Sequence, residues 1–195
     1  MLDCFVTEAG TLPTVRLVTV DGYKDWLATI DTPARRWLEA TGFKAKARAF
    51  PPLPDGDGGM AGAVFVLDAP GTAVDAAALA ANLPKSDHPW HIDDPESLLD
   101  PFELHYGWAL AGYRFERYRK ADNGRAGARL ATDHAAIAER AGELATSVCL
   151  ARDLVNTPAN DMGPAELEAA IRGVADGFGA EVRSIEGEAL LEADY

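Results

Sequence analysis

The feature of the sequence that most constrains the fold is a long helical pattern that begins at about Asp133 and ends at about Val155. Its apolar residues recur at alternating steps of four and three, which is the spacing of one continuous stripe along an α-helix. These residues are Ile137, Ala141, Leu144, Val148, Ala151 and Val155. At about 1.5 Å per residue such a helix is roughly 35 Å long. A helix of that length either crosses the core of one domain or joins two domains, and the pattern alone leaves both possibilities open.

The long helix must end where turn-forming residues gather, between Asn156 and Met162. Pro158 disfavours the helical conformation at Thr157, because its ring clashes with the backbone of the preceding residue. The dipeptide Gly163-Pro164 then predicts the start of a second helix, since proline fits the first helical turn, where its missing donor is not needed.

Beyond that point the chain has the order helix, strand, helix. The second helix is expected to extend to about Phe178, residues 180–185 predict a strand, and residues 187–193 predict a short helix. Such an order is the opening of an α/β layer, and a lone strand can neither satisfy its backbone nor bury both of its faces. We therefore expect a boundary near residues 150–160, followed by the start of another domain.

Before the long helix, strand patterns alternate with helix patterns, which predicts an α/β fold. Strands are expected at residues 14–20, 61–68 and 126–131, an exposed or edge strand at 44–50, and helices at 32–42, 75–83 and 102–118. We expect Thr32 to cap the first of these helices and Gly42 to end it in the left-handed conformation. Trp37 and Leu38 should face inward.

The helix expected at 102–118 is rich in aromatic residues. Its apolar stripe is predicted to comprise Phe102, Tyr106, Ala109 and Tyr113. Glycines inside a helix usually have a packing reason, so Gly107 and Gly112 predict a close approach of neighbouring backbone.

The charge of the chain limits the partners that it can bind. It has 31 acidic and 18 basic residues and a formal net charge of -13. Such a field repels phosphate backbones, so we do not expect nucleic acid as a partner unless a local basic patch overcomes it. The best candidate for such a patch is the set Arg114, Arg117, Arg119, Lys120 and Arg125, whose ordinary interpretation is a solvated basic face.

Cysteine usage and the N-terminus predict a cytoplasmic protein. Cys4 and Cys149 have neither a disulfide pattern nor a metal spacing, and we expect both to be reduced. The N-terminus lacks the basic and apolar regions of a signal peptide. No apolar run approaches the length of a membrane span.

One cluster has a spacing that could suit a metal ion. Imidazole and carboxylate groups are ligands of zinc and manganese, and the cluster comprises His88, His91, Asp93 and Asp94. A proline-rich loop, however, lacks the helical frame that would direct both rings at one ion, so we favour solvated loop histidines. His105 and His134 are isolated, and we expect them to be structural. No G-x-S-x-G motif places a serine nucleophile.

The glycines at 56–62 could in principle cradle a phosphate. The cluster comprises Gly56, Gly58, Gly59 and Gly62. It lacks G-x-x-x-x-G-K-[ST], and it precedes a predicted strand, whereas phosphate loops follow a strand and open a helix. We therefore favour a turn. The residues alone identify no catalytic centre.

The segment after the long helix resembles a known family. Residues 151–167, ARDLVNTPANDMGPAEL, resemble the segment that joins the two domains of the cytosolic leucyl aminopeptidases, whose usual form is R-D-L-x-N-x-P-x-N followed by a helix. The matching positions are Arg152, Asp153, Leu154, Asn156, Pro158 and Asn160. Residues 108–118 and 180–191 are also similar to this family. Gly163 departs from it, because relatives commonly place threonine there.

The resemblance implies a two-domain, two-metal enzyme that removes N-terminal residues from peptides. It implies a macro-like, three-layer α/β domain at 1–132, a linker helix at 133–156 and the truncated start of the catalytic metallopeptidase domain at 157–195. The zinc or manganese ions of the family belong to motifs resembling G-K-G-x-x-x-D-T-G-G and N-T-D-A-E-G-R, which do not occur in this sequence. We therefore expect no catalytic residue, metal ligand or cofactor in this chain, and no activity from the chain alone.

The resemblance also implies roles for the linker motif and for partners. We expect Arg152, Asp153, Asn156, Pro158 and Asn160 to be structural. The two asparagines would bond to turn backbone, and the arginine would pair with a carboxylate of the catalytic domain. Expected partners are that catalytic domain and further copies of the chain, since the family forms hexamers.

Two other functions stay open at this point. The first is a free-standing macro-like module that binds a nucleotide such as ADP-ribose, because residues 58–64 are faintly similar to a macro-domain phosphate loop. The second is a domain that serves only in assembly.

Overall fold

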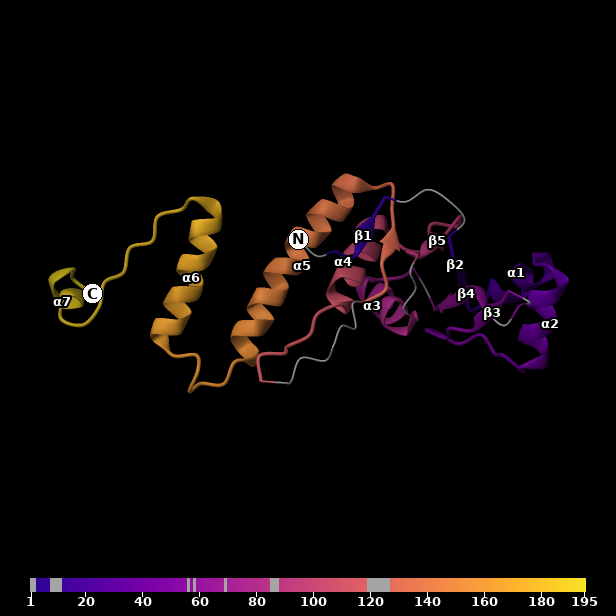
Figure 1. The fold of residues 1–195 in the computed structure, drawn as a ribbon, viewed down its shortest axis with the longest axis horizontal. Coiled ribbons are helices and arrows are strands. Elements are labelled where there is room, and N and C mark those ends of the chain that lie inside the picture. The colour runs from indigo at the N-terminus through magenta and orange to yellow at the C-terminus, as the bar shows by residue number, and fades with distance from the viewer. Residues whose placement is uncertain are drawn as a thin grey trace. The chain divides into compact units, whose positions relative to one another are not determined.

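The computed structural model describes residues 3–7, 12–55, 57, 59–68, 70–84, 88–118 and 127–195. The chain divides into two compact units, Met1–Cys149 and Leu150–Tyr195 (Figure 1).

Parallel strands form the centre of the first unit. Strand β2 (Thr14–Thr19) pairs in parallel with β4 (Met60–Leu67) on one side and with β5 (His91–Asp93) on the other. Strand β3 (Pro52–Pro54) lies antiparallel beyond β4, so the order is β3-β4-β2-β5. The β-branched and apolar residues of β2 and β4 suit a sheet that is covered on both faces. The predicted strands at 14–20 and 61–68 are confirmed.

A second parallel pair continues this arrangement. Strand β1 (Phe5–Val6) pairs with β6 (Leu130–Ala131), the short strand expected within 126–131. A parallel bridge between Trp90 and Leu130 connects this pair to the chain that enters β5. The carboxyl ends of β1, β2, β4, β5 and β6 therefore lie at one edge.

Helices cover the two faces of the sheet. On one face, α3 (Ala73–Asn82) and α4 (Pro101–Ala111) bury a cluster that includes Leu17, Phe65, Leu79, Trp90 and Trp108. On the other face, α1 (Tyr23–Thr29) and the segment after α2 (Thr32–Ala40) cover a smaller cluster of Val18, Tyr23, Val64 and Val66. The first unit thus has the three-layer α/β architecture that was expected.

Helices α3 and α4 approach each other closely at Gly107. A Cβ atom at this position would lie 2.0 Å from the carbonyl oxygen of Ala73 and 2.7 Å from Cβ of Ala76. The packing reason predicted for Gly107 is therefore confirmed. Gly112 is different. A Cβ atom at this position would lie 3.6 Å from the carbonyl oxygen of Ala109, an ordinary contact, and Gly112 is the C-cap of α4.

The start of α2 differs from the prediction. Asp31 is the N-cap, its carboxylate accepting the N–H of Ala34, and Thr32 is the first helical residue. Leu38 is buried as expected, but Trp37 is 42% exposed, and its indole N–H donates to the carbonyl of Pro52. Gly42 has the predicted left-handed conformation, with φ 63°. Helix α1 was not predicted from the sequence.

Residues 44–50 do not form the predicted edge strand. Arg48 has φ 62°, which breaks the extended conformation. The segment nevertheless runs along β4, since the N–H of Arg48 donates to the carbonyl of Val66 and the N–H of Val66 donates to the carbonyl of Ala49. The strand that pairs with β4 at this edge is β3, which follows a few residues later.

Helix α4 is shorter than predicted and buries another face. It ends at Ala111, and its buried positions include His105, Trp108 and Ala109. Phe102 and Tyr106, which were assigned to the apolar stripe, instead stack on each other with ring centroids 5.9 Å apart and are partly exposed. Of the predicted stripe only Ala109 is buried, and the residues that share its face are His105 and Trp108 rather than Phe102 and Tyr106.

Helix α5 (Ala135–Asn156) confirms the predicted long helix but not its predicted stripe. Leu144 and Val155 are 43% and 84% exposed. The buried positions are the small residues Ala138, Ala141, Gly142 and Ala145. Small side chains bring the helix close to β1: a Cβ atom on Gly142 would lie 4.0 Å from the ring of Phe5.

The second unit contains two helices after the end of α5. Helix α6 (Pro164–Phe178) begins as predicted, and the carboxylate of Glu166 accepts the N–H of Gly163. Helix α7 (Ala189–Glu192) confirms the short helix expected at 187–193. An apolar stripe of α6 is exposed; it comprises Leu167, Ile171, Val174 and Phe178.

Residues 180–185 do not form the predicted strand, because no other strand of the second unit pairs with them. Instead, they are held along α6 by Arg172, whose guanidinium donates to the carbonyl of Val182 and to the hydroxyl of Ser184. Arg172 also pairs with Glu168 one turn earlier.

We expect Gly107→Ala to destabilise the first unit by about 1–3 kcal/mol, because the new methyl group must push the backbone of α3 away. Urea unfolding would measure the change. Gly112→Ala is the matched control on the same helix and should change the free energy of unfolding by less than about 0.5 kcal/mol. Equal effects of the two substitutions would show that Gly107 does not set the spacing of α3 and α4.

Candidate functional site

A cavity of about 500 Å³ opens beside the ends of β5 and β6. Ligands of parallel α/β sheets commonly bind outside the carboxyl ends of the strands, so this is where a site would be sought. Its apolar lining includes Ile92, Leu99, Leu104 and Leu130. Its polar lining comes mainly from the chain after the strands and includes Thr7, Asp94, Ser97, Thr132, Asp133 and His134.

A buried histidine is the centre of the polar contacts in this cavity. His105, on α4, is 1% exposed. Its Nδ1 lies 2.6 Å from the carbonyl oxygen of Pro101 and its Nε2 lies 2.8 Å from the hydroxyl of Thr132. The backbone N–H of His134 donates to that same hydroxyl over 3.0 Å. These bonds join the first turn of α4 to the chain that enters α5.

The contacts determine the proton arrangement of the ring. A carbonyl oxygen only accepts, so Nδ1 of His105 must carry the proton. In the neutral ring Nε2 then accepts, and the hydroxyl of Thr132 donates to it. Burial lowers the pKa of His105, and the nearby ring of His134 lowers it further, while the bond to Pro101 and the carboxylate of Asp133 oppose the change. The neutral imidazole is therefore the form that this site stabilises.

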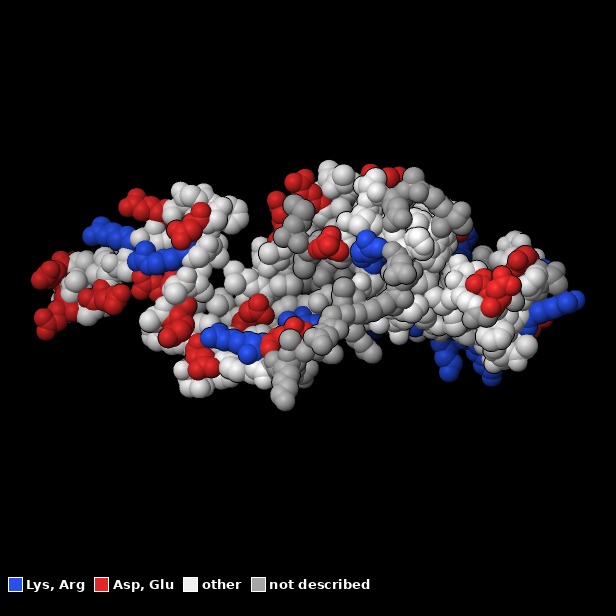
Figure 2. Space-filling model, viewed as in Figure 1, with Lys and Arg blue, Asp and Glu red and all other residues white. Residues whose placement is uncertain are grey.

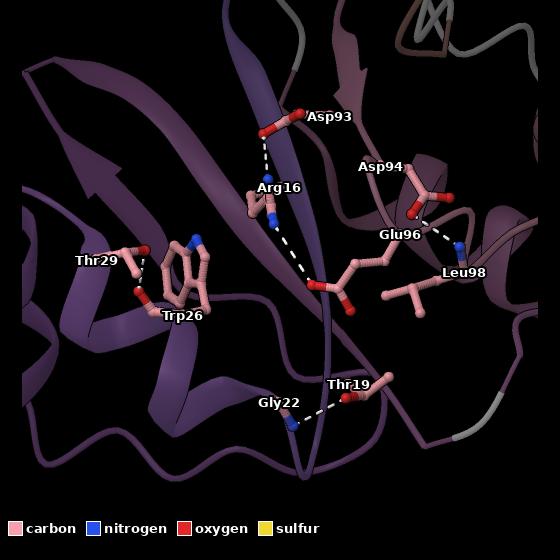
Figure 3. A network of polar contacts seen from close by, with 9 residues as sticks. All are labelled: Arg16, Thr19, Gly22, Trp26, Thr29, Asp93, Asp94, Glu96 and Leu98. Atoms are coloured by element: carbon pink, nitrogen blue, oxygen red, sulfur yellow. Dashed lines mark hydrogen bonds and ion pairs between the residues drawn. The ribbon is translucent and has the colours of Figure 1, made fainter.

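The carboxylates next to β5 are occupied by structural contacts (Figure 3). Asp94 accepts the backbone N–H groups of Leu98 and Leu99 at 2.8 and 2.9 Å. Asp93 pairs with Arg16 of β2 at 3.0 Å, and Glu96 approaches the same guanidinium at 3.7 Å. These bonds fix the loop that leads from β5 into α4.

The proposed metal spacing at 88–94 does not correspond to a cluster of ligands. His91 and Asp94 line the cavity, but the carboxylate of Asp94 is bonded to the loop backbone and that of Asp93 pairs with Arg16. Within the described ranges, no group of three or more His, Cys, Asp or Glu side chains could hold a metal ion. The residues described here therefore do not fit a bound metal.

The described part of the glycine cluster forms a turn. The carboxylate of Asp55 accepts the N–H groups of Asp57 and Gly59 at 2.8 and 2.9 Å, between β3 and β4. An aspartate thus already occupies the donors that a phosphate would need. Gly62 lies in β4, where a Cβ atom would be 2.4 Å from the carbonyl oxygen of Thr14. Gly56 and Gly58 lie outside the described residues.

The basic candidate patch is only partly described. Arg114 donates to the carbonyls of Ala111 and Tyr113 at the end of α4. The guanidinium of Arg117 lies 5.8 Å from the ring centre of Tyr118. Arg119, Lys120 and Arg125 lie outside the described residues. On the face shown in Figure 2, acidic and basic side chains are interspersed and form no broad basic surface.

The residues of the linker motif lie at the end of α5 and in the following turn. Arg152, Asp153 and Asn156 are exposed on the last turns of the helix. Thr157, which is buried, closes it: both its N–H and its hydroxyl donate to the carbonyl of Asp153, at 3.0 and 2.7 Å.

The turn itself is short. The N–H of Asp161 donates to the carbonyl of Pro158, and the side-chain amide of Asn160 donates to the carboxylate of Asp161 at 3.3 Å. The interdomain roles predicted for Arg152, Asp153, Asn156, Pro158 and Asn160 stay a prediction.

The contact of His105 with Thr132 was not foreseen from the sequence. Nothing in the spacing of the two residues, one on α4 and the other just after β6, indicates that they are in contact.

None of the helices within the described ranges is long and apolar enough to cross a membrane.

Comparisons with known proteins agree with this architecture. A family model described as the M17 aminopeptidase N-terminal domain matches residues 13–132. The probable cytosol aminopeptidase of Mycobacterium sp. (strain JLS) is 34% identical over 99 residues, which are 46% of this chain and 19% of that protein. The probable cytosol aminopeptidase of Mycobacterium bovis (strain BCG / Pasteur 1173P2) is 36% identical over 97 residues, with the same coverage. The chain thus matches about a fifth of the length of these relatives.

Solved structures extend the likeness to nearly the whole chain. The cytosol aminopeptidase from Coxiella burnetii has a TM-score of 0.85 and 29% sequence identity, covering 96% of this chain and 41% of that chain. The bottromycin maturation enzyme BotP shares the fold, with a TM-score of 0.67 and 24% identity over 93% of this chain and 41% of that chain. Because the family model covers most of the first unit, the chain belongs to the M17 aminopeptidases and contains their N-terminal domain.

Proposed function

We propose that this chain is the non-catalytic N-terminal portion of a leucyl aminopeptidase-type metallopeptidase, a hydrolase that removes N-terminal amino acids from peptides. The observation that carries the proposal is the match of residues 13–132 to the N-terminal domain of the M17 aminopeptidases. The relatives that match are named cytosol aminopeptidases. In this proposal the three-layer unit serves in assembly and in packing on the catalytic domain.

The proposed division of the chain follows from the linker. Residues 1–132 would form the N-terminal domain, 133–156 the linker helix, and 157–195 the start of the catalytic domain. The exposed apolar stripe of α6 supports this division, because a helix face with Leu167, Ile171 and Val174 at 42–51% exposure needs a further layer to cover it. The extended residues 180–185 would pair with strands of the same domain.

The partners and metals of the complete enzyme are part of the same proposal. Two divalent ions, zinc or manganese, would be bound by residues of the catalytic domain beyond the portion described. Peptides would be its substrates, and copies of the chain would associate as a hexamer. The names of the relatives support a cytoplasmic location.

The alternative of a free-standing ADP-ribose module is not supported. The matching relatives are named aminopeptidases, and the family model describes an aminopeptidase domain. In the turn between β3 and β4, the carboxylate of Asp55 already accepts the N–H of Gly59, a donor that a phosphate would need.

The purified 195-residue chain should not hydrolyse leucyl-p-nitroanilide with added zinc, manganese or magnesium, because the proposal places the metal ligands elsewhere. Release of p-nitroaniline would be followed by absorbance. A purified M17 aminopeptidase that contains the catalytic motifs serves as the positive control. Turnover by this chain that a chelator abolishes would contradict the proposal.

The proposed boundary predicts a gradient of local stability. Amides of α6 should exchange hydrogen much faster than those of Met60–Leu67, because the apolar stripe of α6 lacks its covering layer and burial of one such side chain contributes roughly 1.5–3 kcal/mol. Hydrogen exchange measured by mass spectrometry on dilute monomer would test this. Equal protection of α6 and β4 would mean that residues 157–195 complete the first domain rather than begin another.

A further inference from the structure

The bonds of His105 connect segments of the first unit that are far apart in sequence. On one side the ring holds Pro101 at the start of α4, and on the other it holds Thr132, just before α5. Phe5 of β1 and His134 complete its surroundings, with ring centroids 5.2 and 6.3 Å away. The first turns of α4 and α5 therefore meet at a single titratable side chain.

This bonding chain operates in one protonation state. The N–H of His134 donates to the hydroxyl of Thr132, that hydroxyl donates to Nε2, and Nδ1 donates to Pro101. The hydroxyl hydrogen of Thr132 has Nε2 as its acceptor only while Nε2 is unprotonated, whereas the other two bonds do not depend on the state of Nε2. A proton on Nε2 would turn it into a donor that faces a hydroxyl with its own hydrogen already directed at the ring. That hydroxyl, on a half-buried residue, would have to rotate away from the ring and find another acceptor.

We propose that His105 is a proton-responsive clamp that fastens the start of α5 to α4 at neutral pH and releases it when the ring is protonated. The cavity beside the ring supports the proposal, because it gives the released ring and the loop that enters α5 space in which to move. Protonation would transfer one proton from solvent to Nε2 and would break the hydrogen bond between Nε2 and Thr132.

Of the surroundings of the ring, burial has the largest effect and disfavours a positive charge, the ring of His134 also disfavours it, and Asp133 favours it. The titratable side chains that line the cavity beside the ring are His91, Asp94, Asp133 and His134. Near the ring or its contact residues in sequence, α4 and its N-cap also carry Asp100, Glu103 and Tyr106, the start of α5 carries Glu139 and Arg140, and the chain before β1 carries Asp3 and Cys4. Asp94 and Asp100 are already bonded to backbone N–H groups, and Glu103 accepts the N–H of Ala73. Asp133 also lies 3.5 Å from the ring of His134, which itself faces His105.

The direction of the pH effect follows from the lowered pKa of His105. Its ordinary value is 6.5, and the released state should titrate near that value because the ring then reaches water. The clamped state binds fewer protons. The clamp therefore contributes its full stability above about pH 6.5 and loses it as the pH falls from there towards the lowered pKa.

The linkage also gives the size of the effect. If the clamped ring stays neutral and the released ring titrates at about 6.5, the ratio of released to clamped molecules rises about tenfold between pH 7.5 and pH 5.5. Most carboxylates stay ionised over this range, so their contribution is small.

Hydrogen exchange of the 195-residue chain at pH 7.5 and 5.5, corrected for the intrinsic effect of pH on exchange, tests the clamp. We expect protection to fall about tenfold in residues 132–138 and 101–105 and to stay nearly constant in Met60–Leu67. In parallel, the C2–H resonance of His105 should show no titration near pH 6.5. Titration at the ordinary value, or an equal loss of protection in β4, would overturn the proposal.

A pair of substitutions separates the clamp from other histidines. His105→Gln supplies a side-chain oxygen that can accept from Thr132 but cannot gain a proton in this range, so the acid-induced loss of protection at 132–138 should disappear. His91→Gln removes another histidine of the same cavity and should keep it. Retention of the acid response in His105→Gln would overturn the proposal. If His105→Gln does not fold, the two measurements on the unaltered chain decide alone.

Discussion

The constraint on which the first unit depends is the complete burial of residues 63–67 of strand β4. From Ala63 to Leu67 its residues are at most 1% exposed, on both faces of the sheet. A strand of this kind must be paired on both sides and covered from above and below. Strand β2 pairs along one side, and on the other β3 pairs with residues 60–63 while residues 48–51 bond to Val64 and Val66. The α3–α4 pair covers one face and α1 with the segment after α2 covers the other. Gly107 follows from the same requirement, because the backbones of α3 and α4 share a narrow space over one face.

The elements that depend on local patterns could be predicted from the sequence, and the faces that depend on packing could not. Strands β2 and β4 have long apolar or β-branched runs, and α5 has both length and a sharp end at Pro158. The buried side of α5, however, consists of alanines and a glycine rather than of Leu144 and its neighbours. A helix that packs close to its neighbour needs small residues at the contact, and the spacing of large apolar residues in the sequence does not indicate how close the neighbouring element lies.

Elements whose hydrogen bonds lie outside their own segment were the other source of error. Residues 180–185 have a strand-like composition, but a strand exists only with a partner, and within the second unit they are held by Arg172 instead. Residues 44–50 alternate as an edge strand would, yet the left-handed conformation of Arg48 interrupts the extended backbone, although the segment still bonds to β4. In the candidate site, the contact of His105 with Thr132 depends on how α4 packs against the end of β6 in space, and the spacing of the two residues in the sequence does not encode this.

The polar groups of the first unit serve mainly to position backbone. Asp94 fixes the loop before α4, Asp55 fixes the turn before β4, and Thr132 connects the entrance of α5 to His105. A carboxylate or an imidazole that is bonded in this way has little capacity left for a substrate, which is consistent with an N-terminal domain whose family performs its chemistry elsewhere. His105 differs from the other groups because its hydrogen bond from Thr132 requires an unprotonated Nε2. In the proposed clamp, the contacts that hold α4 and the start of α5 together would also respond to protonation of His105.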